Sequence, residues 1–323
     1  IIKNIQSLDL KKDTYATREL SGLYLNEMIK HSSNIIIGSA DLGSSNKTLI
    51  KNENIHKDDF TKLYLNYGIR EHAMVGIANG ISTYGILPVV STFLVFLSYC
   101  YGALRLSALA KHKVLFVFTH DSFYVGEDGP THQPIECLTL LRSIPNLLVF
   151  RPADHNEIIG CYREALCYDG PSCMILSRQS LPMLSNTNSL KVRHGIYPIH
   201  EAENSNTILI ATGSEVSLAM DIANQCSNVS VFSMPCFELA DPAQLSDFQL
   251  FWSAVYGEPQ QVFSIEAGVS KDLHHICHGS FGIKTFGESA PAGDLKKHFE
   301  FTKEDIISKI ENFKPQKNLF KHN

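Results

Sequence analysis

The residue types best suited to chemistry gather first around one glutamate, Glu71, in the segment NYGIREHAM at residues 66–74. An apolar run precedes this segment and a helix-like pattern follows it, so Glu71 falls at the start of a predicted helix. Gly68 permits a tight strand-to-helix turn, and the helix dipole favours a carboxylate in the first turn. A carboxylate buried there is suited to acid–base chemistry near neutral pH. The same pattern is compatible with a glutamate that only caps the helix.

A second group of reactive side chains follows a predicted strand at residues 114–118. The sequence THDSFYVGEDGPTHQP occupies residues 119–134 and contains His120, Asp128 and His132. Polar groups at the carboxyl end of a parallel strand are typical of ligand sites in open α/β folds. Histidine and aspartate are also ordinary metal ligands, but this spacing matches no recognisable ligand pattern. Either histidine alone is compatible with a surface loop.

The composition indicates a globular protein of about two domains. The chain has 323 residues, of which 44% are hydrophobic and 19% are charged, and its net charge is −5. This charge gives no electrostatic case for nucleic acid, and we find no long basic block. An acidic chain that binds phosphorylated ligands must therefore concentrate its positive groups locally.

A membrane span and disulfide bonds are both disfavoured. Residues 86–110 carry a single charge, at Arg105, but Pro88 and several hydroxyl residues interrupt them, which favours a strand and a buried helix. The eight cysteines are scattered without CxxC pairs, which predicts reduced thiols in a cytoplasmic protein. Because the chain begins with Ile1 rather than methionine, we expect it to be cut from a longer protein.

Alternating strand-like and helix-like patterns predict an α/β fold with two parallel or mixed open-sheet domains. The first domain is expected at residues 1–185 and the second, smaller domain at residues 186–323, with a polar linker at 182–189. Strands are predicted at 34–38, 62–66, 87–90, 114–119, 146–150, 172–176, 207–211, 229–233 and 262–265. Helices are predicted at 17–30, 71–83, 93–110, 156–168 and 302–313, with another opening at 213, and the basic tail at 314–323 is expected to be solvated.

Together these motifs resemble those of the transketolase family. The strings at 66–74 and 119–134 are similar to its activating-glutamate motif and its sugar-phosphate loop, and RPAD at 151–154 and LSRQ at 176–179 also match. The resemblance runs from about residue 17 to residue 313 and covers the family's pyrimidine-binding and C-terminal domains. The family's front domain, which holds a diphosphate through a divalent metal, has no counterpart, since no Gly-Asp-Gly with a downstream Asn is present.

The resemblance implies a thiamine-diphosphate enzyme that transfers a two-carbon ketol unit from a ketose phosphate to an aldose phosphate. It implies Mg²⁺ or Ca²⁺ beside the diphosphate, with the metal ligands outside this chain, and a homodimer whose sites are shared between subunits. Two alternatives stay open: a sister enzyme such as dihydroxyacetone synthase or deoxyxylulose-phosphate synthase, and a non-catalytic transketolase-like binding or regulatory protein. The strings REHA at 70–73 and EDGPTH at 127–132 favour transketolase over deoxyxylulose-phosphate synthase.

The resemblance also assigns the cofactor-binding residues. Glu71 matches the glutamate that hydrogen-bonds N1′ of the aminopyrimidine, and it is the catalytic residue expected here. Asp41 and Leu42 match residues beside the thiazolium ring. An aromatic wall around the aminopyrimidine is expected from Phe93, Phe96 and Tyr99. Without the family, a spacing of three favours a core stripe of a helix over a ring pocket.

The substrate-binding residues follow from the same resemblance. The sugar-phosphate ligands are expected at Arg18, Ser45, His120 and Arg178. This assignment is physically reasonable because guanidinium groups bind phosphate bidentately. Two further residues complete the expected site. Asp128 would recognise a substrate hydroxyl group, and His132 would bind the carbonyl end of the donor.

The chain departs from the family pattern in two places. Phe123 and Tyr124 replace two smaller residues, and a large ring at 124 is expected to narrow the sugar channel. The string SKDLHH at 270–275 lacks the usual Gly-Trp. Histidines at 274, 275 and 278 with Cys277 invite comparison with a metal cluster, but adjacent histidines do not share a helical face, so no metal site is predicted.

Overall fold

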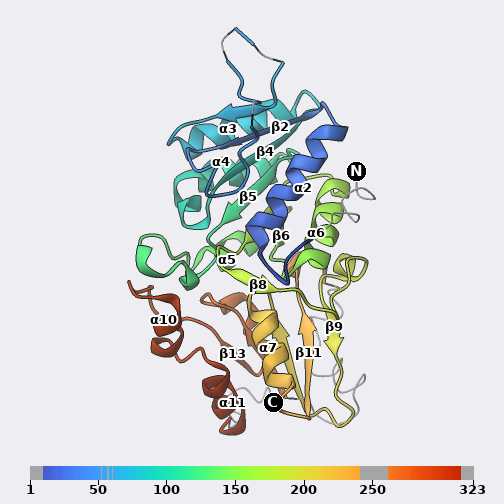
Figure 1. Cartoon of the computed structure of the whole chain (residues 1–323), viewed down its shortest axis with the longest axis vertical. Helices are drawn as coiled ribbons and strands as arrows, with labels where there is room; N and C mark the ends of the chain where they lie inside the picture. Colours follow the sequence, from blue (N-terminus) through green and yellow to red (C-terminus); the bar gives the residue numbers. More distant parts are fainter. Residues whose placement is uncertain (1–9, 52, 57, 60, 241–260, 314–323) are drawn as a thin grey trace, which may run out of the picture.

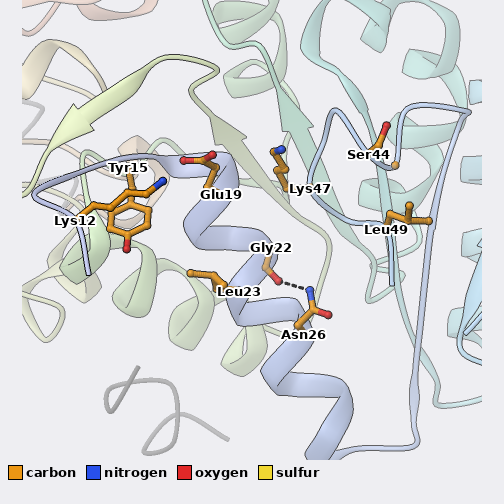
Figure 2. A pocket seen from close by; sticks show the side chains of 10 residues that line it. Lys12, Tyr15, Glu19, Gly22, Leu23, Asn26, Ser44, Lys47 and Leu49 are labelled. Atoms are coloured by element: carbon orange, nitrogen blue, oxygen red, sulfur yellow. Dashed lines mark hydrogen bonds between the residues drawn. The ribbon is translucent and has the colours of Figure 1, made fainter. Parts of the chain in front are cut away.

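The structure is a computed structural model that describes residues 10–51, 53–56, 58–59, 61–240 and 261–313. Its described part contains two α/β units placed end to end (Figure 1), one drawn from blue to green and the other from yellow to red. No helix in that part is long and apolar enough to cross a bilayer. The predicted α/β class with two open sheets is confirmed.

The first sheet has six parallel strands in the order β3-β2-β4-β5-β7-β6. Successive strand residues point to opposite faces, so Val117 and Phe118 enter two different apolar clusters. Because both faces are buried, the strands read as continuous apolar runs. The strands are β2 (Ile35–Ser39), β3 (Tyr64–Asn66), β4 (Leu87–Phe93), β5 (Leu115–Thr119), β6 (Leu148–Phe150) and β7 (Ser172–Leu176).

Helices cover both faces of this sheet (Figure 1). On one face lie α2 (Thr17–His31) and α6 (His155–Cys167). On the other face lie α3 (Glu71–Ser82), α4 (Leu97–Leu109) and α5 (Cys137–Arg142). A small antiparallel sheet of β1 (Thr14–Ala16) and β8 (Ser180–Pro182) joins the two ends of the unit.

The second sheet has five strands in the order β13-β12-β10-β11-β9, and only β9 is antiparallel. Its strands are β9 (Tyr197–His200), β10 (Thr207–Ala211), β11 (Val229–Ser233), β12 (Gln261–Ile265) and β13 (Gly279–Phe281), and its helices are α7 (Glu215–Ala223), α10 (Ala292–His298) and α11 (Lys303–Glu311). The sequence analysis did not predict β9, β13 or α10. The three half-buried residues of β13 and the seven residues of α10 are too short to carry a clear period.

The helix predicted at residues 93–110 begins later than expected. Strand β4 continues to Phe93, which pairs with Thr119 in the register between β4 and β5. A 3₁₀ turn, η1 (Leu94–Phe96), then leads into α4. An apolar run that is buried on all sides does not reveal by its pattern where a strand ends and a helix begins.

Buried ion pairs join the two units. Each of two buried guanidinium groups from the first unit binds two carboxylates: Arg142 pairs with Glu266 at 2.7 Å and Asp272 at 2.6 Å, and Arg151 pairs with Asp121 at 2.7 Å and with Glu215. We call these six residues the junction. Hydroxyl groups also donate to its carboxylates, as Thr212 does to Glu266 at 2.6 Å. The RPAD motif at 151–154 thus connects the two units through its arginine.

The rings of Phe123 and Tyr124 pack beside this junction. Phe123 is fully buried, with its ring centroid 5.3 Å from that of Phe299 and 5.6 Å from that of Phe301. Tyr124 stacks on Phe123 at 4.3 Å, and burial together with the charge of Glu215 raises the pKa of Tyr124. The structure therefore does not support the expected narrowing of a sugar channel by Tyr124. These rings fix the second unit against the first.

Candidate active site

Five strands of the first sheet end beside residues that the sequence analysis singled out. Asp41 follows β2, Glu71 follows β3, Phe93 ends β4, His120 follows β5 and Arg178 follows β7. Parallel strands end at one edge of a sheet, and that edge is where open α/β folds bind ligands. The fold therefore gathers residues that are far apart in sequence.

Glu71 is buried without a partner. It is the first residue of α3, it is 7% exposed, and it lines a pocket of about 680 Å³ with Arg70, Phe96 and Tyr99 among others. No described residue forms a hydrogen bond or ion pair with its carboxylate. Gly68 makes the preceding turn with φ of 67°, as the sequence analysis expects. The carboxylate faces the pocket and has no protein partner there, so it is available to a ligand.

Three aromatic rings form one wall of this pocket region. The rings of Phe93 and Phe96 stack with centroids 5.8 Å apart, and that of Tyr99 lies 6.0 Å from Phe96. They come from the end of β4, from η1 and from α4, so they do not share one helical face. Tyr99 is 65% exposed, which a core stripe would not allow. Phe96 and Tyr99 line the pocket and offer an apolar surface for a flat ligand, and the buried ring of Phe93 stacks on Phe96.

Hydrogen bonds hold the imidazole of His120 in one tautomer. Arg18 Nη1 lies 3.3 Å from Nε2, and Thr119 Oγ1 lies 2.8 Å from Nδ1 and donates its own proton to Asn46 Oδ1 at 2.8 Å. Because arginine only donates, Nε2 accepts and Nδ1 carries the proton. Burial, with the positive charges of Arg18 and Arg178, lowers the pKa of His120 to about 3. His120 is therefore neutral at physiological pH.

Arg18 and Arg178 form a cationic end of the site. Arg18 Nη1 also donates to the backbone carbonyl of Ser45 at 2.7 Å. Burial and the charge of Arg178 lower the pKa of Arg18. The Nε of Arg18 is buried without a hydrogen-bond partner, and neither arginine forms a salt bridge within the described part of the chain. Two uncompensated guanidinium groups favour a dianionic ligand such as a phosphate.

The remaining predicted residues are less closely engaged. The ring of His132 lies 5.6 Å from that of Phe96, so His132 joins the aromatic wall. Leu42 is half-buried, and Asp41 and Asp128 are exposed. The side chains of Asp41 and Asp128 have no hydrogen bond or ion pair with any described residue. Their assigned roles stay predictions.

Two strand ends carry a backbone conformation that is rare outside glycine. Asp41 and His120 have φ of 64° and 61°. Such a conformation costs about 1–3 kcal/mol and is concentrated at functional sites. Five other described residues that are not glycine share this conformation, so it does not by itself mark the site.

The sequence of the chain matches two family models. Residues 13–183 match the model described as transketolase, pyrimidine binding domain, and residues 195–302 match that of the transketolase-like TK C-terminal domain. The first match alone covers more than half of the chain. The chain belongs to the transketolase family.

Known transketolases agree with this assignment. The chain is 40% identical to transketolase 1 of Saccharomyces cerevisiae, over 93% of this chain and 46% of that protein. It is 42% identical to the transketolase of Sinorhizobium medicae, over 91% of this chain and 44% of that protein. The structure of transketolase from Leishmania mexicana superposes with a TM-score of 0.86 at 39% identity, covering 94% of this chain and 46% of the other. The chain thus spans less than half the length of these transketolases.

The site fits the pyrimidine end of the family's cofactor, thiamine diphosphate. A carboxylate without a protein partner lines one pocket with the rings of Phe96 and Tyr99, which suits a flat ring that has a nitrogen to bind. Among the described residues, no group of three or more His, Cys, Asp or Glu side chains could hold a metal ion.

Several residues of this transketolase site escaped the sequence analysis. Thr119 and Asn46 fix the tautomer of His120 across 73 residues of sequence. Thr17 and Ser177 bond to each other across 160 residues. Each pair lies next to a predicted ligand, and that adjacency is the one signal the sequence offers.

Proposed function

We propose that this chain is the pyrimidine-binding and C-terminal half of a transketolase of the pentose phosphate pathway. The reaction is the thiamine-diphosphate-dependent transfer of a two-carbon ketol unit from a ketose phosphate to an aldose phosphate. The observation that carries the proposal is the buried, unpaired Glu71 beside an aromatic wall, at the same sheet edge as two uncompensated arginines. A transketolase of Pichia stipitis that superposes with a TM-score of 0.86 at 34% identity was solved in complex with sedoheptulose 7-phosphate.

Glu71 would hold a proton at the aminopyrimidine nitrogen N1′. The bound cofactor supplies an acidic thiazolium C–H whose carbon becomes the nucleophile toward the ketose carbonyl. The carboxyl group of Glu71 would share its proton with N1′, and its burial would keep competing water away from that proton. Phe93, Phe96 and Tyr99 would orient the ring against Glu71.

The cationic end would bind the phosphate of either sugar. Arg18 and Arg178 supply guanidinium donors, and the lone pair of neutral His120 orients Arg18. His132, on the aromatic wall, would contact the carbonyl end of the donor, and Asp128 would read a hydroxyl group. The distance between the two ends of the site then selects the length of the sugar phosphate.

Completion of the site requires residues beyond this half. We assign Mg²⁺ or Ca²⁺ and the diphosphate to the other half of a homodimer whose sites are shared between subunits. Exposed apolar residues on and after α3 and on α4 support such an interface: Ile77, Tyr84, Leu106 and Leu109. We place the reaction in the cytoplasm, and the eight cysteines, all free thiols, support a reducing compartment.

The proposal is tested by restoring the other half. Residues 1–323, joined to the front domain of a transketolase or mixed with it, should convert xylulose 5-phosphate and ribose 5-phosphate when thiamine diphosphate and Mg²⁺ are present. The isolated chain should show no transfer, and calorimetry should show weak or no cofactor binding. A joined protein that folds and binds the cofactor tightly but transfers no ketol unit would identify the chain as a non-catalytic relative.

A further inference from the structure

Thr17 and Ser177 bind each other through reciprocal hydrogen bonds. The backbone N–H of Thr17 donates to Ser177 Oγ at 3.0 Å, and that of Ser177 donates to Thr17 Oγ1 at 2.7 Å. The hydroxyl of Thr17 lies 3.2 Å from Ser177 Oγ, whose own hydroxyl donates to the carbonyl of Gln179 at 2.9 Å. Both hydroxyl groups and both backbone N–H groups of the pair therefore have hydrogen-bond partners. We call this pair the clamp.

The clamp is rigid and buried. Thr17 is 1% exposed and Ser177 is 2% exposed. Thr17 is the first residue of α2, and Ser177 directly follows β7. Behind the clamp, Ala16 of β1 pairs with Ser180 of β8. Backbone and side-chain bonds together therefore fix the start of α2 against the end of β7.

Each member of the clamp is the chain neighbour of one phosphate-site arginine. Arg18 follows Thr17, and Arg178 follows Ser177. The two guanidinium groups repel each other, and no salt bridge to a described residue holds them together. A neutral clamp at their backbones keeps the two charges close without occupying the donors that a ligand needs.

We propose that Thr17 and Ser177 are positioning residues that set the spacing of the Arg18 and Arg178 guanidinium groups for a sugar phosphate. This inference rests on the function proposed above. Neither residue touches the phosphate, because both of their side chains are committed to each other. Their contribution is to hold the two charged side chains close together before the ligand binds. The binding step then does not bear the entropy cost of ordering them.

The principal test is Thr17→Val in the joined enzyme, which keeps the shape of the side chain and removes its hydroxyl. We expect the KM for xylulose 5-phosphate to rise about tenfold, the loss expected from one misplaced charge-assisted hydrogen bond, with little change in kcat. Thr17→Ser, which restores the hydroxyl, should restore the KM. Ser180→Ala, an exposed serine three residues beyond Ser177, is the matched control. Equal KM values for the Val and Ser variants, or a fall in kcat alone, would overturn the proposal.

A second measurement separates the clamp from catalysis. Inorganic phosphate is titrated into the isolated chain while the ring signals of His120 are followed by NMR, and Thr17→Val should need about tenfold more phosphate than the unsubstituted chain. Identical titrations, or no response of the unsubstituted chain to phosphate, would refute the clamp's role. If the titrations differ as expected but the joined enzyme transfers no ketol unit, the proposed function fails and the clamp stands.

Discussion

The active-site edge and the junction both hold arginines and carboxylates, yet these charges are paired at one and unpaired at the other. At the junction, Arg142 and Arg151 each bind two carboxylates. At the active-site edge, Arg18 and Glu71 have no ion-pair partner among the described residues. Burial of charge alone therefore does not distinguish a binding site from a structural contact. The state of pairing does.

This difference has an energetic meaning. Removing one partner of a buried ion pair leaves the other charge uncompensated, so a junction residue is expected to contribute to stability. Removing a charge that has no protein partner breaks no ion pair, so an active-site residue is expected to contribute to function and little to folding. The predictions below test this contrast, beginning with the largest effect.

Glu71→Gln should lower the rate of ketol transfer in the joined enzyme by about 10²- to 10⁴-fold, the range for loss of a general acid–base group. An amide cannot share an ionisable proton with N1′. Thermal unfolding should show a stability equal to or above that of the unsubstituted protein. Steady-state rates at saturating cofactor measure the effect, with the exposed Glu203→Gln as control. Near-normal rates would reduce Glu71 to a helix-capping residue.

Arg151→Met should lower the free energy of unfolding by about 3–5 kcal/mol, because Asp121 and Glu215 lose their buried counter-charge. Denaturant unfolding measures this loss. The matched control is Arg193→Met, at an exposed arginine, which should stay within about 0.5 kcal/mol of the unsubstituted protein. If both variants unfold alike, the junction does not stabilise the fold and the contrast fails.

Arg18→Ala and Arg178→Ala should each raise the KM for xylulose 5-phosphate by about 10- to 150-fold, the value of one charge-assisted phosphate contact. The KM for hydroxypyruvate, which has no phosphate, should rise far less. Arg193→Ala is the control for loss of a surface charge. An equal loss with both substrates would mean that Arg18 and Arg178 hold structure, as the junction arginines do.

The smallest effect concerns Glu157, a carboxyl group where the two units meet. It accepts a hydrogen bond from Tyr197 at 2.6 Å, and burial together with the charge of Asp154 raises the pKa of Glu157 to about 7. Its ordinary pKa lies near 4.3, so the folded protein holds the proton more tightly than the unfolded chain. The stabilisation is present at low pH and is lost as the pH rises from about 4.5 to 7, with a slope below about 1.4 kcal/mol per pH unit.

Unfolding measured across this pH range should show that slope, and Glu157→Gln should flatten it, because an amide does not titrate. Glu164→Gln, at a half-buried carboxyl group of the same helix, serves as the control. A slope that survives Glu157→Gln would assign the proton to another group.

The sequence predicted the elements whose signals are local. The strand before Glu71, the turn at Gly68 and the strand before His120 each follow from a short pattern of residues, and the structure contains all three. Motif resemblance then predicted which residues lie together. It assigned Arg18 and His120 to one phosphate site, and in the structure Arg18 Nη1 lies 3.3 Å from His120 Nε2.

What could not be predicted depends on contacts between distant segments. No local pattern shows that Phe123 packs on Phe301 or that Thr17 bonds to Ser177, because both contacts span more than 150 residues. The end of β4 at Phe93 was also missed, since its pairing with Thr119 is set by the neighbouring strand. Residue type tells what a side chain can bind, and the fold decides what it does bind.

The junction also has a consequence for how the protein is made. Asp272 lies 130 residues after its partner Arg142. At synthesis rates of about 5–20 residues per second, Asp272 is added to the chain roughly 7 to 26 seconds after Arg142. A nascent first unit therefore holds two arginines that still lack the carboxylates of the second. The first unit can pack its own core before then, but its junction arginines gain their cross-unit partners only when the second unit has been synthesised.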